Sequence, residues 1–176
     1  MKNSEEIFEI LKQQFGDSIV SLEKDAPTEP IIICAPLEMH NIAAFMRQNE
    51  DLKFDSLMCL SGVDDANGTK AKDADELETI TGGSLSVYYH LHSIELKHKI
   101  TLKVSTDRDN PKVESVENIW KCADWHEREA FDMYGIVFLN HPDLRRILMP
   151  YDWEAGFPLR KDYKNPEFYQ GMKVPY

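Results

Sequence analysis

The sequence has no apolar run long enough to cross a membrane and nothing that resembles a secretory signal. Its longest unbroken apolar stretches, such as residues 31–35, fall far short of the roughly 18 residues that a spanning helix needs. The first residues, MKNSEEIFEIL, do not place an apolar block behind a basic leader. The sequence therefore predicts a soluble protein that stays in the cytoplasm.

Cysteines are few, and their spacing excludes the usual cysteine-ligated centres. Cys34, Cys59 and Cys122 are widely separated, whereas iron–sulfur clusters and structural zinc sites normally carry CxxC-type pairs. Cys34 and Cys59 lie in apolar, strand-like runs, where a thiol usually behaves as a small buried hydrophobic group. The sequence also lacks a glycine-rich cofactor loop. We therefore expect no redox centre, metal or cofactor in this chain.

Basic residues are scarce, since 20 Lys and Arg oppose 31 Asp and Glu for a formal net charge of −11 at pH 7. This charge repels nucleic acid phosphates and anionic lipid headgroups, so both are disfavoured as direct partners. The excess of acidic residues lies in the first part of the chain. Positions 1–139 hold 14 basic and 26 acidic side chains, whereas positions 140–176 hold six basic and five acidic ones. A slightly basic tail thus follows an acidic body.

Apolar residues at helical spacing predict two long helices, residues 3–15 and 37–48. Ser4 is the expected N-cap of the first helix, and Gly16 its stop. Each helix has an apolar face that needs a sheet to cover it. Further along the chain, the pattern indicates one broken or two short helices at residues 116–121 and 125–134, ended by Gly135.

β-rich runs predict five strands, at residues 19–22, 31–34, 54–63, 84–92 and 99–104. The first two could form a hairpin, and the last two are joined by a short polar connection. The order α-β-β-α-β-β-β, with both helices on one face of the sheet, predicts an α+β fold. A length of 176 residues allows one such domain with an extended appendage.

An acidic insertion at residues 64–83 separates the third and fourth predicted strands. Residues 64–78 hold six acids and two lysines, and Gly82 and Gly83 close the stretch, which is typical of a solvated loop or a long hairpin tip. A calcium loop would need alternating Asp/Asn ligands, a central Gly and a terminal Glu. The insertion lacks that spacing, so metal binding is disfavoured.

Residues 140–176 combine five prolines with seven bulky aromatics and show no sustained helical or alternating pattern. A flexible linker would be poor in aromatics, and a packed domain would be periodic. An extended segment that buries its aromatics against another surface fits better. We therefore divide the chain into an α+β domain, residues 1–139, and an extended C-terminal tail, residues 140–176, that docks on partner subunits.

Charged residues are concentrated in residues 120–148. Glu129 and Asp132 are three residues apart and Arg128 and Asp132 are four apart, so these side chains can meet on one side of a helix. Arg145 and Arg146 follow the helix and carry planar guanidinium groups suited to carboxylates. The pattern predicts an ion-pair network that ties the helix to the tail.

Three catalytic interpretations compete with this structural one. A zinc protease helix needs HExxH, but Ala130 stands where the second His belongs. A di-iron bundle needs paired ExxH units, which this segment lacks. Glu127 and Glu129 could act as general acid and base, although Arg128 between them favours ionised carboxylates over a raised pKa. A free-standing enzyme that uses this pair is the alternative from a different functional class.

Residues 127–148 read E-R-E-x2-D-M-Y-x6-H-x3-R-R-I-L, which resembles the signature of the complex I 30 kDa subunit family. Its members are known as the C subunit in bacteria and the J subunit in photosynthetic NDH complexes. Residues 151–154 and 156–163 are similar to the family's tail, so the resemblance is strong over residues 120–163. The N-terminal part matches only in the order of its elements, and the acidic insertion departs from the common pattern.

The resemblance implies a two-layer α+β domain with a mixed sheet, in a non-redox connecting subunit of proton-translocating NADH:quinone oxidoreductase. It implies a place in the peripheral arm, on the cytoplasmic side of the inner membrane or its organellar equivalent. The forty-nine-kilodalton quinone-site subunit and iron–sulfur subunits would be its neighbours, and partner subunits would hold flavin, clusters and quinone. No catalytic residue carries over. The signature residues, expected at subunit interfaces, are Glu127, Arg128, Glu129, Asp132, Gly135, His141, Pro142, Arg145, Arg146, Trp153, Phe157, Arg160, Asp162 and Tyr163.

The same signature fits the equivalent subunit of a membrane-bound hydrogenase, a formate hydrogenlyase or an F420H2 dehydrogenase. These complexes share the connecting module, so the motif alone does not separate them. Neighbouring genes would do so, because they would encode either a nickel-site subunit or an NADH-flavin subunit.

Overall fold

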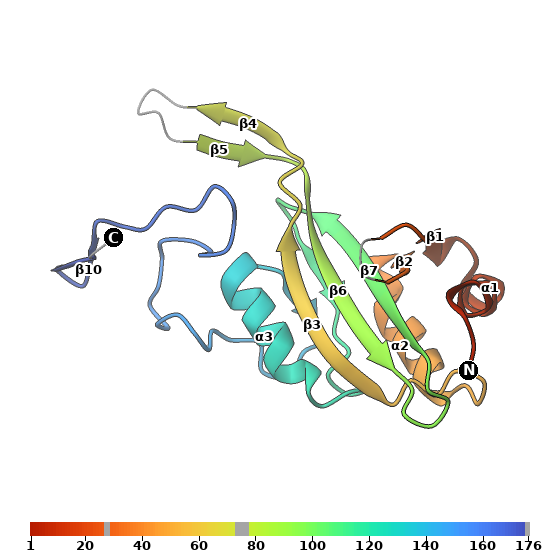
Figure 1. The fold of residues 1–176 in the computed structure, drawn as a ribbon. Coiled ribbons are helices and arrows are strands. Elements are labelled where there is room, and N and C mark those ends of the chain that lie inside the picture. Colours follow the sequence, from red (N-terminus) through yellow and green to blue (C-terminus); the bar gives the residue numbers. More distant parts are fainter. Residues whose placement is uncertain (27–28, 73–77, 175–176) are drawn as a thin grey trace.

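The computed structural model describes residues 1–26, 29–72 and 78–174 (Figure 1). Its helices are α1 (Ser4–Phe15), α2 (Met39–Gln48) and α3 (Ala123–Tyr134), and short 3-10 turns cover Gly16–Ser18 and Pro36–Glu38. The strands are β1 (Ile19–Glu23), β2 (Ile31–Cys34), β3 (Ser56–Asp64), β4 (Thr69–Lys72), β5 (Glu78–Thr81), β6 (Ser84–His92), β7 (Lys99–Asp107), β8 (Lys112–Glu114), β9 (Val137–Leu139), β10 (Phe168–Tyr169) and β11 (Met172–Lys173). None of the helices in these ranges is long and apolar enough to cross a bilayer.

Five strands form one mixed sheet in the order β1-β2-β7-β6-β3. β2 and β7 run parallel, and every other pair of neighbours is antiparallel. The architecture confirms the predicted α+β fold with a mixed sheet. The antiparallel pairing of β1 with β2 confirms the predicted hairpin arrangement, and β6 has the predicted bounds.

One face of the sheet is buried beneath the helices. Along β6 the odd-numbered residues from 85 to 91 are fully buried, because alternate side chains of a strand point to the same face. Residues of all three helices, among them Ile7, Ile42 and Ala130, join these strand residues in one hydrophobic cluster. On the opposite face, side chains such as His90 and Lys103 remain partly exposed.

The start of each N-terminal helix differs slightly from the prediction. Asn3, not Ser4, caps α1, because its side chain accepts from the Glu6 N–H (2.9 Å) while the Glu6 carboxylate accepts from the Asn3 N–H (2.8 Å). This reciprocal pair is a capping box. α2 starts at Met39 rather than residue 37, because the chain first makes a 3-10 turn with proline at its beginning.

The predicted helix at residues 116–121 is wrong. This segment forms turns in which the Val116 carbonyl accepts from the N–H groups of Ile119 and Trp120, both at 3.0 Å. α3 then follows as one uninterrupted helix and ends at Gly135 (φ 77°), as predicted. β8 and β9 pair in parallel before and after α3, and strands of three residues are too short to show alternation in a sequence.

The acidic insertion contains a β-hairpin, which confirms the hairpin interpretation of residues 64–83. β4 and β5 pair from Thr69 opposite Thr81 to Lys72 opposite Glu78, and residues 73–77 lie outside the described part of the chain. Figure 1 shows the two strands projecting beyond the ends of β3 and β6. At the base of the hairpin the N–H of Ile80 donates to the carboxylate of Asp162 (3.3 Å), so the hairpin contacts the C-terminal tail.

The cysteines have three different environments. Cys34 is buried as expected, and burial raises the pKa of its thiol to about 12, so the thiol stays protonated. The same expectation for Cys59 is wrong, since it is only partly buried. A β-bulge follows Leu57, and the Cys59 sulfur lies 3.4 Å from the Ser61 hydroxyl on the open face of the sheet. Cys122 is exposed.

Candidate functional site: helix α3 and the strap that covers it

The C-terminal tail has two parts in the structure. Residues 141–163, named the strap here, are fastened to α3 and to the ends of β3 and β7. Residues 164–174, named the tail end, contain the short strands β10 and β11. Figure 1 shows the tail end reaching away from the sheet, beyond α3.

Asp132 of α3 is the first fastening point of the strap. Its fully buried carboxylate accepts from the Arg146 guanidinium at Oδ1 (2.7 Å). Its Oδ2 accepts from three successive N–H groups, those of residues 147 (2.9 Å), 148 (2.7 Å) and 149 (2.9 Å). Burial by itself would raise the pKa of Asp132, but these hydrogen bonds outweigh burial and hold the pKa below its usual value. Asp132 therefore stays ionised inside the fold.

Arg108, at the end of β7, forms the second fastening point. Its buried guanidinium contacts Asp64 at the end of β3 (2.6 Å) and Asp162 of the strap (2.5 Å). Asp64 also accepts from the N–H of Lys161 (2.8 Å). Burial, the largest single effect, opposes ionisation of Asp64, but the bonds from Arg108 and from the N–H groups of Lys161 and Ala66 together outweigh it and lower the pKa of Asp64. The carboxylates of strand and strap are thus joined through one buried cation.

Gly135 and Phe157 form a third contact between α3 and the strap. Gly135 has φ 77°, and a Cβ added there would lie 2.5 Å from the Phe157 ring. Arg160 stacks on the same ring at 4.7 Å and donates from Nε to the carbonyl of Tyr134 (2.7 Å). The aromatic ring and the guanidinium therefore cover the C-terminal end of the helix.

Gly135→Ala is expected to destabilise the protein more than Gly171→Ala. Both glycines have positive φ, 77° and 78°, so both substitutions cost about 1 kcal/mol of backbone strain. Only Gly135 faces a ring, which adds about 1 to 3 kcal/mol of overpacking. Urea unfolding of the two variants measures the difference. Equal losses of unfolding free energy would show that Phe157 does not press on the helix end.

Glu127 lies on the opposite, inward side of α3 and is fully buried. It accepts from the Ser115 hydroxyl (2.6 Å) and from the Val116 N–H (2.8 Å), and the His141 ring lies 3.9 Å away. Burial, the largest effect, raises the pKa of Glu127 to about 7 despite these hydrogen bonds. The expectation that Arg128 keeps this carboxylate ionised is wrong, because Arg128 turns away from it.

Glu127→Gln is expected to remove a pH dependence of stability. Because the pKa of Glu127 is raised from 4.5 to about 7, its contribution to stability is complete below pH 4.5 and is lost as pH rises through 7. The free energy of unfolding of the variant, relative to that of the parent chain, should therefore rise by roughly 3 kcal/mol from pH 4.5 to pH 8. Exposed Glu129→Gln is the matched control and should show no such trend. A constant difference across this range would contradict a carboxyl kept neutral by burial.

Arg128 does not meet Asp132, so that part of the predicted ion-pair network is wrong. It pairs instead with Asp124, four residues earlier on the same helix (2.8 Å), and stacks on the Trp125 ring at 4.2 Å. The carboxylate of Asp132 already accepts hydrogen bonds from the strap. Asp124 lies one helical turn before Arg128, at the same spacing as Asp132, and pairs with it instead. The predicted link between the helix and Arg146 is confirmed.

The remaining signature residues face outward or link the strap to itself. Glu129 and Pro142 are exposed, and exposed Arg145 pairs with Asp143 (3.0 Å). Trp153 and Tyr163 are partly buried within the tail. Since Glu127 is buried and Glu129 exposed, the two carboxylates do not form an acid–base pair.

The sequence analysis missed Asp64 and Arg108 altogether. They meet Asp162 from the ends of strands that are remote from the strap along the chain, and no local spacing signals such a contact. Ser115, the partner of Glu127, was missed for the same reason. Among the described residues, no three His, Cys, Asp or Glu side chains are grouped so that they could hold a metal ion.

Residues 32–169 match the family model described as "Respiratory-chain NADH dehydrogenase, 30 Kd subunit". The C subunit of NADH-quinone oxidoreductase from Chloroherpeton thalassium is 45% identical over 171 residues, which are 96% of this chain and 64% of that relative. The chain therefore spans less than two thirds of that relative's length. The protein of the same name from Chlorobium phaeobacteroides is 40% identical over 169 residues, 96% of this chain and 93% of the relative.

A solved structure shares the fold. It is the trypsin-resistant fragment (1–134) of Nqo5, with a TM-score of 0.56 and 20% sequence identity, and the match covers 77% of this chain and 97% of the fragment.

Proposed function

The chain belongs to the family of the 30 Kd subunit of respiratory-chain NADH dehydrogenase, and on that premise we propose that it is the C subunit of a proton-translocating NADH-quinone oxidoreductase. In this role it is one part of a multi-subunit enzyme. It contributes to electron delivery by joining other subunits, and it performs no redox step itself. The family match carries the proposal, because residues 32–169 include the signature helix, the strap and most of the tail end.

The proposed role assigns flavin, iron–sulfur clusters and quinone to partner subunits. The arrangement of the cysteines supports this division. Cys34, Cys59 and Cys122 lie apart on β2, on β3 and before α3, with buried, intermediate and exposed side chains respectively. A cluster needs several thiolates converging on one point, and these three thiols do not converge.

The partners that we propose are the quinone-site subunit and the neighbouring iron–sulfur subunits, on the cytoplasmic side of the inner membrane. The surface of the strap and tail end supports a docking role. Five large apolar side chains are exposed there, and Tyr151 is 95% exposed. Such a concentration of exposed apolar groups marks an interaction surface. They are Leu148, Tyr151, Leu159, Phe168 and Met172.

Affinity purification from native membranes tests the proposal. The tagged chain, expressed at its natural level in a strain that lacks the untagged copy, is recovered after mild detergent extraction and its partners are identified by mass spectrometry. NADH-flavin, quinone-site and iron–sulfur subunits in equal stoichiometry are the expected result. Recovery with nickel-site hydrogenase subunits would replace the proposal with the hydrogenase alternative, and recovery as an isolated chain would contradict both.

A further inference from the structure

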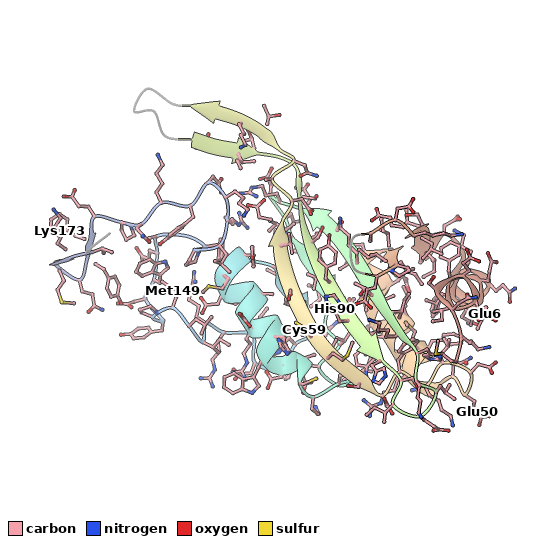
Figure 2. The ribbon with its side chains drawn as sticks, viewed as in Figure 1. Glu6, Glu50, Cys59, His90, Met149 and Lys173 are labelled. Atoms are coloured by element: carbon pink, nitrogen blue, oxygen red, sulfur yellow. The ribbon has the colours of Figure 1, made fainter. Side chains whose placement is uncertain are left out.

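A pocket of about 570 Å³ opens in the tail. It lies between residues 152–155 of the strap and residues 166–170 of the tail end, which include β10. Figure 2, in which Lys173 is labelled, shows that this end of the chain stands well apart from the sheet. The side chains that matter among those lining the pocket are Asp152, Trp153, Glu154, Phe168, Tyr169 and Gln170. The pocket therefore belongs to the tail itself and not to the helix–strap contacts described above.

Hydrogen bonds within the tail hold the pocket in shape. The Tyr169 hydroxyl donates to Asp152 Oδ1 (2.7 Å), and the Gln170 amide donates to Asp152 Oδ2 (2.8 Å). The rings of Trp153 and Tyr169 lie 5.2 Å apart at 49°. The backbone N–H of Trp153 donates to the Pro150 carbonyl (3.1 Å) and fixes the turn that carries the indole. The walls are thus organised before any partner arrives.

The chemistry of the lining is acidic and aromatic. Asp152 and Glu154 are both present, and no Lys or Arg lines the pocket, although the tail as a whole is slightly basic. Asp152 stays ionised, because the bonds from Tyr169 and Gln170 lower its pKa. Glu154 is exposed and has no ion-pair partner among the described residues. A free carboxylate beside an indole face is suited to a cation.

We propose that this pocket receives an arginine side chain of a neighbouring subunit, stacked on the Trp153 ring and paired with the Glu154 carboxylate. A planar guanidinium can do both at once, because it stacks on aromatic faces and forms two parallel bonds to a carboxylate. This inference rests on the proposed function, since it takes the tail to be a docking surface, and adds the chemistry of the partner.

Nuclear magnetic resonance of the whole chain tests the chemistry directly. The chain has three tryptophans, so its indole N–H region contains three signals. Titration with N-acetyl-argininamide should shift the Trp153 signal in a saturable way. It should leave the signal of Trp120 in place, because that indole is buried and bonded to the Phe54 carbonyl (3.0 Å).

Two matched comparisons decide the outcome. The neutral citrulline analogue should bind at least several-fold more weakly, and Glu154→Gln should weaken binding of the arginine probe about threefold or more. Glu167 is an acid of the tail end outside the pocket lining, so Glu167→Gln should leave binding unchanged. No shift of Trp153, or equal binding of the two probes, overturns the proposal. N-acetyl-lysinamide is titrated in the same way, and stronger binding of this probe than of the arginine probe would overturn the choice of guanidinium.

A second experiment separates failure of the pocket from failure of the proposed function. The membrane purification above is repeated with Glu154→Lys and with Glu167→Lys, which change the net charge equally. Loss of partner subunits at moderate salt with Glu154→Lys alone supports the pocket. If both variants retain every partner of the parent chain, the pocket proposal fails while the proposed function stands. If the parent chain itself brings down no partner, the proposed function fails.

Discussion

Asp132→Ala should lower the free energy of unfolding by about 3 to 5 kcal/mol, the usual result of removing one partner from a buried charged pair. The substitution leaves the Arg146 guanidinium, only 18% exposed, and three strap N–H groups without their acceptor. Urea denaturation at pH 7 measures the loss. The matched control is Asp143→Ala, since Asp143 is 55% exposed and its pairs are worth about 1 kcal/mol or less.

Comparable losses for the two alanine variants would contradict a strap fastened at Asp132. The pH dependence offers an independent check. The pKa of Asp132 is lowered in the folded state, so its contribution is present above the unfolded pKa, near 3.8, and is lost as pH falls through the folded pKa. The difference between the parent and Asp132→Ala should therefore shrink at acid pH. This is opposite in sign to the dependence expected for Glu127.

Truncation after Asn140 is expected to abolish cooperative unfolding or to lower the free energy of unfolding by well over about 3 kcal/mol. The loss should equal that of the Asp132 substitution plus that of a second buried contact. It removes every strap partner of Asp132, the Asp162 partner of Arg108 and the Phe157 ring over Gly135. A tail that begins at residue 140 and only docks on partners predicts instead a body that folds alone and loses about 1 kcal/mol or less of ion pairing, on the assumption that the ion pairs are exposed. Burial of Asp132 and Arg108 overturns that assumption.

Truncation after Lys164 is the control for this prediction. It keeps the strap and removes the tail end, whose strands contact each other and the strap at Asp152 and Trp153 but not the hydrophobic core. Thermal unfolding of the two shortened chains should differ strongly, with the longer one close to the full chain. If both unfold like the full chain, the strap is not part of the folded body. We accordingly propose that the functional boundary lies near residue 164 rather than at residue 140.

The parts of the fold that depend on local pattern could be predicted. β6 was bounded correctly because its residues alternate between the sheet's two faces, and α1 was predicted to within one residue because its apolar residues recur at helical spacing. The link between α3 and Arg146 was also visible, since guanidinium groups follow the acidic helix closely. The local pattern did not identify the correct ion-pair partner where one residue had two acids at the same helical spacing. Arg128 lies four residues from both Asp124 and Asp132, and only the strap decides between them.

Contacts between distant segments could not be predicted. The Asp64–Arg108–Asp162 cluster assembles three element ends that are remote in the sequence. The burial of Glu127 could not be predicted either, because a carboxylate in a highly charged segment normally belongs to a solvent-exposed helix face. The family resemblance implies that the signature residues lie at subunit interfaces, and their contacts within the chain, such as those of Glu127, Asp132 and Arg146, could not be predicted from the motif.

Recovery of the complex from cells that carry only the chain ending at Lys164 tests the central claim most directly. The account predicts a shortened chain that folds normally, because Asp132 and Arg108 keep their strap partners. It also predicts that recovery of the NADH-quinone oxidoreductase falls by about tenfold or more, since interface aromatics often contribute roughly 2 kcal/mol each. A complex that assembles fully without the tail end would contradict the claim that this segment forms part of the docking surface.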